Sequence, residues 1–284
     1  MRCEEIAVLN SNGEPFNIDL RYHESNKFFD YKNFVIICPG FMAFKDWGPF
    51  PYIGEKIADF HFATIVMNYS HNGINENRYK ITNFKKFFEN TISKELDDIE
   101  SVLSWLYGNF KKSDKDNKII LMGHSRGAAN SILIAANSNV NGIITISPIA
   151  NYDRWNDHQK SLWRCKGYLP LSSESSNSIL KIGIEYLNDL ENNRDKYAIE
   201  SSAAKLKIPW LIIHGENDLV AKIDEAEKLY NLSNKNLTDL FIIPNMGHLL
   251  GYNQYPDNQK NIFINKIITI IKEWLNKNFR SENE

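Results

Sequence analysis

The sequence has few cysteines and no long hydrophobic run. Its 284 residues include three cysteines, Cys3, Cys38 and Cys165, an odd number at unrelated spacings. Neither a disulfide framework nor a C-x-x-C motif follows from them, which is typical of reduced thiols in a cytoplasmic protein. The first ten residues include two glutamates and lack an apolar core, so we expect no secretory signal peptide there. No apolar run approaches the ~20 residues that cross a bilayer, and we expect no membrane partner.

The sequence also lacks an excess of charge of one sign. It has 33 basic and 35 acidic residues, which leaves a net charge of -2 at pH 7. Nothing in this balance indicates nucleic acid or an anionic membrane as a partner. The H-E-x-x-H, Walker A and G-x-G-x-x-G patterns are absent as well. We therefore expect no nucleic-acid partner, no metal and no organic cofactor, and the oligomeric state stays open.

The composition is that of a globular protein, with 43% hydrophobic and 24% charged residues. Two apolar segments around a Gly-Pro-containing turn, 4–9 and 16–22, predict an N-terminal hairpin. Short β-branched runs predict strands buried on both faces at 34–38, 64–67, 119–122, 142–147, 210–214 and 240–243. Helical periodicity lies between them, at 53–60, 91–106, 128–137, 223–232 and 261–279. This alternation predicts an α/β sheet with right-handed crossovers.

The helix at 91–106 shows the clearest periodicity. Its apolar residues recur at helical spacing, and its acidic residues are expected mostly on the other face: Glu95, Asp97, Asp98 and Glu100.

One long segment interrupts the alternation of strands and helices. Residues 151–205 contain no buried-strand run, but they include several aromatic residues, a Ser-rich turn and a helical stretch at 179–190. A compact domain does not tolerate a structureless loop of this length. The sequence therefore predicts a core formed by residues 1–150 and 206–284, with residues 151–205 inserted as a lid over the sheet edge.

The most informative motif is Gly123-His124-Ser125-Arg126-Gly127, which directly follows the predicted strand 119–122 and precedes a predicted helix. It matches G-x-S-x-G, the nucleophile elbow of serine hydrolases. Glycines on either side of the serine remove side chains that would collide in so tight a turn. The alternative is a glycine-bracketed turn with an idle serine. The strand and helix signals around the motif favour a serine held above the sheet, at a helix N-terminus that favours negative charge.

A catalytic serine needs a base, and the base needs an acid that orients it. Among the seven histidines, His248 is the favoured base, because it lies in a loop just past the last predicted strand. Asp218 directly follows the strand at 210–214 and is the favoured acid, although a turn or N-cap aspartate is the alternative interpretation. Glu216 and Asp153 remain rival acids. The order serine, aspartate, histidine is the one expected after a nucleophile elbow.

A tetrahedral intermediate also needs two backbone N–H donors for its oxyanion. The first is expected from Arg126, the residue after the serine. The second is expected from Phe41, because the loop Pro39-Gly40-Phe41-Met42 follows the strand at 34–38. An ordinary Pro-Gly turn is the alternative for this loop.

Together these motifs resemble the α/β-hydrolase superfamily, and within it the bacterial serine esterases with a modest lid, including the cinnamoyl and feruloyl esterase type. The resemblance rests on Pro39-Gly40-Phe41, the elbow, His214-Gly215-Glu216-Asn217-Asp218 and Gly247-His248, and extends over residues 4–279. It implies an α/β-hydrolase fold with a mostly parallel sheet of about eight strands, flanking helices and an inserted helical lid. It also implies a triad of Ser125, Asp218 and His248. Many relatives have His-Gly where this chain has Pro39-Gly40, a change that loses a side-chain hydrogen bond able to brace the loop.

The activity expected from these features is hydrolysis of small or aromatic carboxylic esters through an acyl-enzyme. Aromatic residues between the sheet edge and the lid are expected to line the substrate pocket: Phe44, Trp47, Trp155, Trp163 and Tyr168. Packing of the lid on the core is the alternative for each of them. The same triad also serves peptidases, acyl-peptide hydrolases, thioesterases and acyltransferases, and a non-catalytic ligand-binding protein on this fold is a further alternative.

Overall fold

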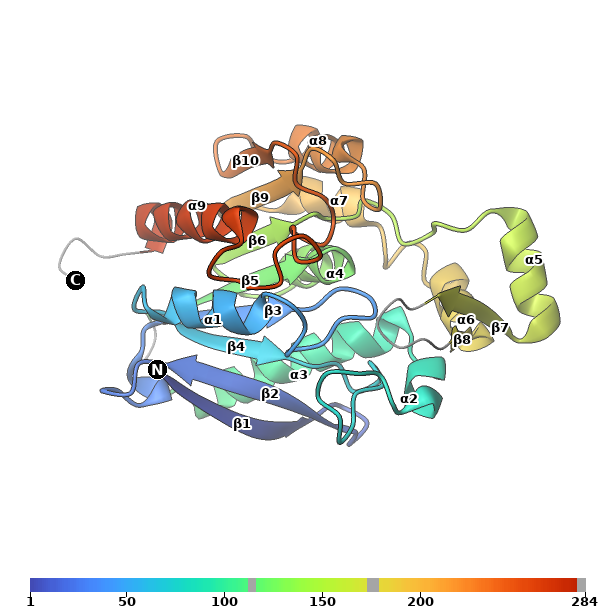
Figure 1. Ribbon diagram of the computed structural model, residues 1–284, viewed down its shortest axis with the longest axis horizontal. Coiled ribbons are helices and arrows are strands. Elements are labelled where there is room, and N and C mark those ends of the chain that lie inside the picture. Colours follow the sequence, from blue (N-terminus) through green and yellow to red (C-terminus); the bar gives the residue numbers. More distant parts are fainter. Residues whose placement is uncertain (112–115, 173–178, 280–284) are drawn as a thin grey trace.

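The computed structural model describes residues 1–111, 116–172 and 179–279. An eight-stranded sheet forms its centre, with the strand order β1-β2-β4-β3-β5-β6-β9-β10 (Figure 1). These strands are β1 (Arg2–Leu9), β2 (Pro15–Tyr22), β3 (Asn33–Cys38), β4 (Ala63–Met67), β5 (Lys118–His124), β6 (Gly142–Ile146), β9 (Trp210–Gly215) and β10 (Thr238–Ile243). Strands β4, β3, β5, β6, β9 and β10, in this order across the sheet, are parallel to one another, whereas β2 is antiparallel to both β1 and β4.

Helices cover both faces of the sheet. Helices α1 (Phe50–Ala58) and α9 (Ile262–Phe279) lie on one face, and α3 (Ile92–Asn109) and α4 (Arg126–Ala135) lie on the other (Figure 1). The remaining helices are α2 (Phe84–Phe88), α5 (Asp157–Lys166), α6 (Ile184–Asn192), α7 (Ile199–Lys205), α8 (Ile223–Leu232) and the short 3-10 helix η1 (Phe28–Asp30). Alternate residues of β3 serve the two apolar layers, Phe34 and Ile36 on one side and Val35 and Ile37 on the other. This explains why the central strands are continuous apolar runs.

The predicted mostly parallel sheet of about eight strands is confirmed, including the N-terminal hairpin and the six further strands. Burial on both faces is wrong for the strand at 240–243, because β10 is at the edge of the sheet and its Phe241 side chain is exposed. The helix predicted at 179–190 is wrong in its first five residues. Ile179–Gly183 forms β8, which pairs antiparallel with β7 (Tyr168–Ser172), and α6 begins at Ile184. Leu180 and Ile182 are buried while Ile179 and Lys181 are exposed, and this alternation has the period of a strand. The Ser-rich turn lies largely outside the described residues.

The expected acidic face of α3 is also wrong in part, because Glu95 and Asp98 are buried. Both carboxylates have polar partners that the sequence alone does not place near them. Glu95 contacts Arg126, Asn90 and Asn130, while Asp98 accepts hydrogen bonds from the Asn10 amide and the Ser70 backbone N–H. Buried carboxylates require such partners.

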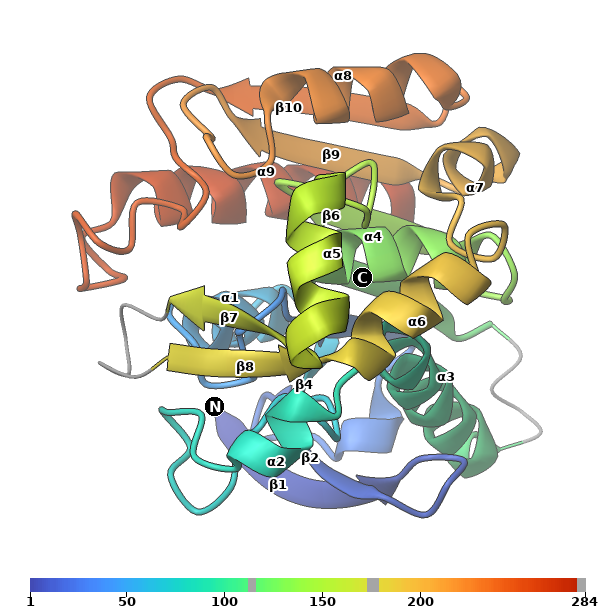
Figure 2. The ribbon, with the colours of Figure 1, turned by 90° about the vertical axis from the view of Figure 1, so that its right-hand side faces the viewer.

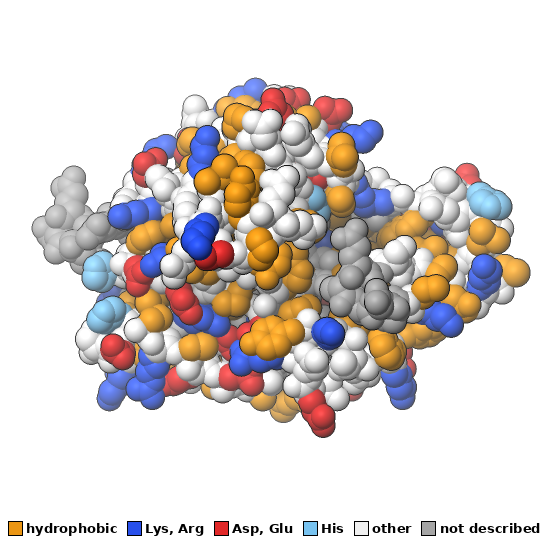
Figure 3. Space-filling model, in the orientation of Figure 1, with side chains coloured by type: hydrophobic (Ala, Val, Ile, Leu, Met, Phe, Trp, Pro, Cys, Tyr) orange, Lys and Arg blue, Asp and Glu red, His pale blue; other side chains and the backbone are white. Residues whose placement is uncertain are grey.

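The described part of residues 151–205 lies at the edge of the sheet where the parallel strands end. Figure 2 looks onto this edge, with α5, α6 and the hairpin β7–β8 in front of the strands. The face shown in Figure 3 has acidic and basic side chains interspersed, in keeping with the balanced composition. Within the described residues, no helix has both the length and the apolar character needed to cross a membrane.

Candidate active site

Ser125 lies between β5 and α4 in a backbone conformation that few non-glycine residues adopt, with φ 54° and ψ -119°. Two close contacts explain the glycines around it. A Cβ on Gly123 would lie 2.2 Å from the Gly127 carbonyl oxygen, and one on Gly127 would lie 2.2 Å from the Cys38 carbonyl oxygen. The elbow therefore tolerates no side chain at either position. A residue held in such a strained conformation costs about 1–3 kcal/mol and is a feature of functional sites.

Three residues far apart in the sequence meet at the carboxyl ends of the strands. The Ser125 Oγ lies 2.9 Å from His248 Nε2, and His248 Nδ1 lies 2.8 Å from Asp218 Oδ2. Ser125 follows β5, Asp218 follows β9, and His248 lies in the loop between β10 and α9. The Ser125 and His248 side chains are partly exposed, whereas Asp218 is buried. A serine, an imidazole and a carboxylate in this arrangement can act as a nucleophile, a base and an acid that orients the base.

The Asp218 carboxylate has two structural tasks. Its Oδ2 atom faces His248, and its Oδ1 atom accepts hydrogen bonds of 2.9 Å from the backbone N–H groups of Val220 and Ala221. Burial opposes ionisation of this carboxyl, but the hydrogen bond and charge of His248, with the Ala221 N–H, keep its pKa below the ordinary value. The carboxylate is therefore charged at neutral pH and locked in place from both sides.

Two further histidines support the loops around this site. The ring of His124, the second residue of the elbow, lies 5.0 Å from the His248 ring, and its Nε2 hydrogen-bonds the His248 carbonyl oxygen. No motif in the sequence predicts this contact. His214 Nε2 similarly bonds the Ala221 carbonyl oxygen at 2.8 Å. Burial lowers the pKa of both histidines, that of His124 to about 3. Both rings are therefore neutral donors that hold the loops of His248 and Asp218.

The rival acids lie in other environments. Asp153 Oδ2 pairs with Lys160 Nζ at 2.5 Å, and the exposed Glu216 accepts a hydrogen bond from the Asn245 backbone N–H. Neither carboxylate contacts His248 among the hydrogen bonds of the described residues.

The loop after β3 approaches the elbow closely. A Cβ on Gly40 would lie 3.2 Å from the Ser125 Cβ, a tight contact, so glycine lets the backbone lie this close to the serine without displacing it. Among the described residues, the backbone N–H groups of Phe41 and Arg126 have no hydrogen-bond acceptor. The Tyr69 hydroxyl donates to the Pro39 carbonyl oxygen at 3.2 Å. Tyr69 thus supports the Pro39-Gly40-Phe41 loop with a side-chain hydrogen bond. The presence of proline in place of histidine at position 39 predicts the loss of a different one.

A buried polar cluster lies beneath this loop. The Arg126 guanidinium contacts the Glu95 carboxylate and the Tyr186 hydroxyl, and its Cζ atom lies 3.8 Å from the centre of the Phe41 ring. Asn130 joins Glu95 to Tyr69 through its amide nitrogen. The charge–aromatic contact and the ion pair are both removed from water, which strengthens them. The Arg126 side chain thus links the elbow, α3, the Phe41 loop and α6.

The five predicted pocket residues have different surroundings. Phe44 and Trp163 are buried, and Trp163 stacks on Tyr186 with ring centres 5.9 Å apart. The other three are only partly buried. Trp155 packs against Trp163 and Tyr186, Trp47 stacks on His124, and Lys181 lies over the Tyr168 ring. Trp163 therefore packs between helices α5 and α6.

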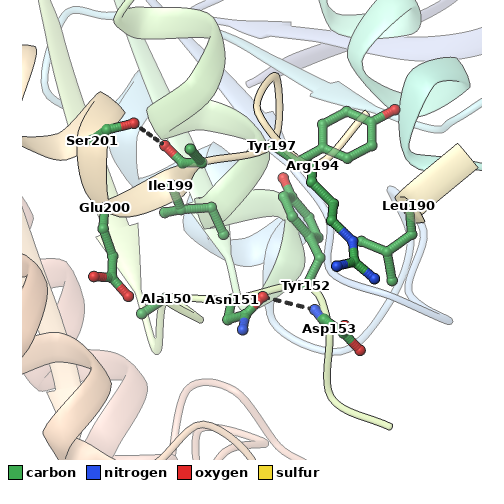
Figure 4. Close-up of a pocket in the computed structure, with 11 residues that line it drawn as sticks. Ala150, Asn151, Tyr152, Asp153, Leu190, Arg194, Tyr197, Ile199, Glu200 and Ser201 are labelled. Atoms are coloured by element: carbon green, nitrogen blue, oxygen red, sulfur yellow. Dashed lines mark hydrogen bonds between the residues drawn. The ribbon is translucent and has the colours of Figure 1, made fainter. Parts of the chain in front are cut away.

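Two cavities lie at this end of the molecule. One, of about 430 Å³, is formed by residues 150–153, by the end of α6, by the start of α7 and by the connection between these helices, with Tyr152, Arg194 and Glu200 among its lining (Figure 4). The other, of about 260 Å³, is lined by His248 and by residues of the Asp218 and His248 loops. Within the described residues, no group of three or more His, Cys, Asp or Glu side chains is placed to hold a metal ion.

Comparisons with known proteins agree with this architecture. The family described as "Alpha/beta hydrolase of unknown function (DUF1057)" matches residues 100–158, which include the elbow. Est1E from Butyrivibrio proteoclasticus, solved with ferulic acid, is 18% identical, with 96% of this chain and 98% of that chain covered at a TM-score of 0.69. The α/β hydrolase GrgF from Penicillium sp. sh18 is 14% identical, with 98% and 99% covered at a TM-score of 0.72. The esterase domain of a Rhodothermus marinus protein is also 14% identical, with 98% and 99% covered at 0.65. No curated protein gave a significant match.

The chain therefore has the α/β-hydrolase fold over nearly its whole length. It resembles the esterases of that fold, as the motifs predict.

Proposed function

We propose that the protein is a serine hydrolase of the carboxylesterase type, with Ser125 as nucleophile, His248 as general base and Asp218 as the acid that orients His248. The observation that carries this proposal is the hydrogen-bonded chain from Ser125 Oγ through His248 to Asp218, with contacts of 2.9 and 2.8 Å. Each contact is short enough for proton transfer or orientation. The strained backbone of Ser125 and the N–H groups beside it support the same roles.

In the proposed reaction, Ser125 Oγ attacks the carbonyl carbon of the ester while His248 Nε2 takes the hydroxyl proton. The backbone N–H groups of Phe41 and Arg126 donate to the oxyanion that forms. The bond to the alcohol oxygen then breaks, and His248 gives its proton to that oxygen, leaving an acyl-serine. His248 next takes a proton from water, whose oxygen attacks the acyl carbon. The acid leaves as the proton returns to Ser125.

The proposed substrates are small-molecule esters with a small or aromatic acyl group. A row of aromatic rings supports this class: Phe41 and Trp155 are partly exposed, and both pack against the buried Tyr186 ring, with ring centres 6.4 and 5.6 Å from it. Phe41 carries one proposed oxyanion donor, so this row begins at the reaction centre. The ferulic acid in the Est1E structure is an aromatic acid as well. We further propose that residues 151–205 act as a lid over the core formed by residues 1–150 and 206–284.

We also propose a cytoplasmic location. The three cysteines, Cys3, Cys38 and Cys165, are free thiols in the structure, which fits a reducing compartment.

The decisive test is labelling with a fluorophosphonate probe, which reacts with an activated serine. We expect the wild type to be labelled and Ser125→Ala to remain unlabelled, while Ser201→Ala, a control at an exposed helical serine, labels like the wild type. A folded wild type that takes no label would refute the proposal. Esters, thioesters and aminoacyl amides of one acid would then rank the substrate classes. Faster turnover of amides or thioesters would refute the carboxylesterase assignment.

A further inference from the structure

The cavity beside His248 has an apolar wall that is separate from the aromatic rings proposed for the acyl group. It measures about 260 Å³ and lies between the loop after β9 and the loop after β10. Leu219 and Val220 line it from the first loop, and His248 and Leu249 line it from the second. His248 also contacts Ser125 Oγ through its Nε2 atom, so one wall of this cavity is the base of the proposed triad.

The apolar wall is held in place by the triad itself. Leu219 is 91% exposed and Val220 is 54% exposed, so neither side chain contributes much to the core. Both are positioned by the turn in which Asp218 Oδ1 accepts the N–H groups of Val220 and Ala221. The other oxygen of the same carboxylate holds His248. The distance between the apolar wall and the base is thus set by one buried side chain.

The chemistry of ester cleavage decides which part of the substrate lies here. His248 must give its proton to the oxygen of the departing alcohol, so that oxygen lies near His248 Nε2 when the bond breaks. The alcohol portion therefore extends along His248, whereas the acyl carbon is bound to Ser125 Oγ. The other cavity offers no comparable contact, because its lining includes charged residues but no member of the proposed triad (Figure 4).

We propose that the cavity formed by Leu219, Val220, His248 and Leu249 binds the alcohol portion of the substrate and selects uncharged alkyl alcohols. This inference rests on the proposed ester hydrolysis. A substrate chain lying against Leu219 and Val220 would cover apolar surface that water now contacts. Each methylene so covered is expected to raise kcat/KM by about fourfold. The released product is then an aliphatic alcohol, and the class of reaction that supplies the substrate is esterification of such an alcohol.

The test compares two ester series with wild type, Leu219→Ser and the control Leu9→Ser. Leu9 is also an exposed leucine, 63% exposed on β1, so the control makes the same chemical change elsewhere. One series keeps a benzoyl group and varies the alcohol from methyl to hexyl. The other keeps a methyl alcohol and varies the acyl group from acetyl to hexanoyl. Rates of fluorophosphonate labelling are measured in parallel.

We expect Leu219→Ser to lower kcat/KM for the hexyl ester by about tenfold and for the methyl ester by less than about twofold. The acyl series and Leu9→Ser should match the wild type. Equal losses for all alcohols, losses that follow acyl length, or no loss at all would overturn the inference; the last outcome leaves the exposed leucine as a contact for another protein. Failure of the underlying function is distinguishable, because the wild type would then hydrolyse no ester and take no label.

Discussion

The Arg126 side chain offers a direct test of how the oxyanion loop is positioned. We consider Arg126→Met, Glu95→Gln and the double variant. Arg126→Met removes the guanidinium that lies 3.8 Å from the Phe41 ring centre and leaves the Glu95 carboxylate without its cation. Glu95→Gln keeps the size of that side chain and leaves the guanidinium without its anion. The double variant removes both charges, so no unpaired charge remains buried.

The expected magnitudes follow from burial. The Arg126 and Glu95 side chains are 6% and 3% exposed, and breaking a buried ion pair costs about 3–5 kcal/mol of stability. Each single variant should lose that amount. The double variant should be more stable than the sum of the two losses predicts, by about 3 kcal/mol. A desolvated cation–π contact is worth about 2 kcal/mol, so loss of the preferred Phe41 position should lower kcat by up to about thirtyfold.

The assay combines urea denaturation with kcat and KM for ester hydrolysis. We expect kcat to remain low in the double variant although its stability partly recovers, with KM changed little, because the proposed oxyanion donors would act in the transition state. Recovery of both stability and wild-type kcat in the double variant would refute the reasoning. The guanidinium would then serve the ion pair alone.

Three further predictions concern the surroundings of the site. Replacement His124→Phe keeps an aromatic ring but removes the hydrogen bond to the His248 carbonyl oxygen, so kcat should fall about fivefold; an unchanged kcat would argue against this support. Burial raises the Asp98 pKa to about 7, so the native state holds a proton that the unfolded chain releases near pH 4, and stability falls as pH rises between these values. Asp98→Asn should lack this slope, so its free energy of unfolding, measured by urea denaturation, should rise relative to the wild type by up to about 4 kcal/mol between pH 4 and pH 8. A stability difference between the two proteins that does not change with pH would contradict the raised pKa. His71, whose pKa burial lowers to about 4, titrates in both proteins and cancels from the comparison. Gly127→Ala should abolish labelling of Ser125, because its Cβ would lie 2.2 Å from the Cys38 oxygen, while Gly108→Ala, with open space around the new Cβ, should label normally.

Much of the candidate site is local in the sequence, which is why motifs could place it. The elbow is five consecutive residues between a strand and a helix. Each of its glycines is required because a side chain there would collide with the turn itself or with the neighbouring strand. Asp218 and His248 could be chosen because the carboxyl ends of parallel strands meet at one edge of a sheet. The helix predicted at 179–190 is wrong in its first five residues because the segment lacks such a local signal. A five-residue strand with alternating burial and a short helix joined at Gly183 give no long periodic pattern.

Strand and helix alternation, the parallel sheet and the chain order of serine, aspartate and histidine were determined by the sequence itself, because periodicity and turn chemistry act over a few residues. The tertiary structure decided which distant groups became neighbours. The Arg126 pairing with Glu95, the Tyr69 brace on Pro39 and the His124 contact with His248 join segments 31, 30 and 124 residues apart. Only packing brings such groups together. The pattern of α3 predicts that Glu95 faces solvent, and only the fold shows that a buried cation pairs with it. The apolar wall beside His248 has the same origin, as the meeting of two loops whose separation no local pattern encodes.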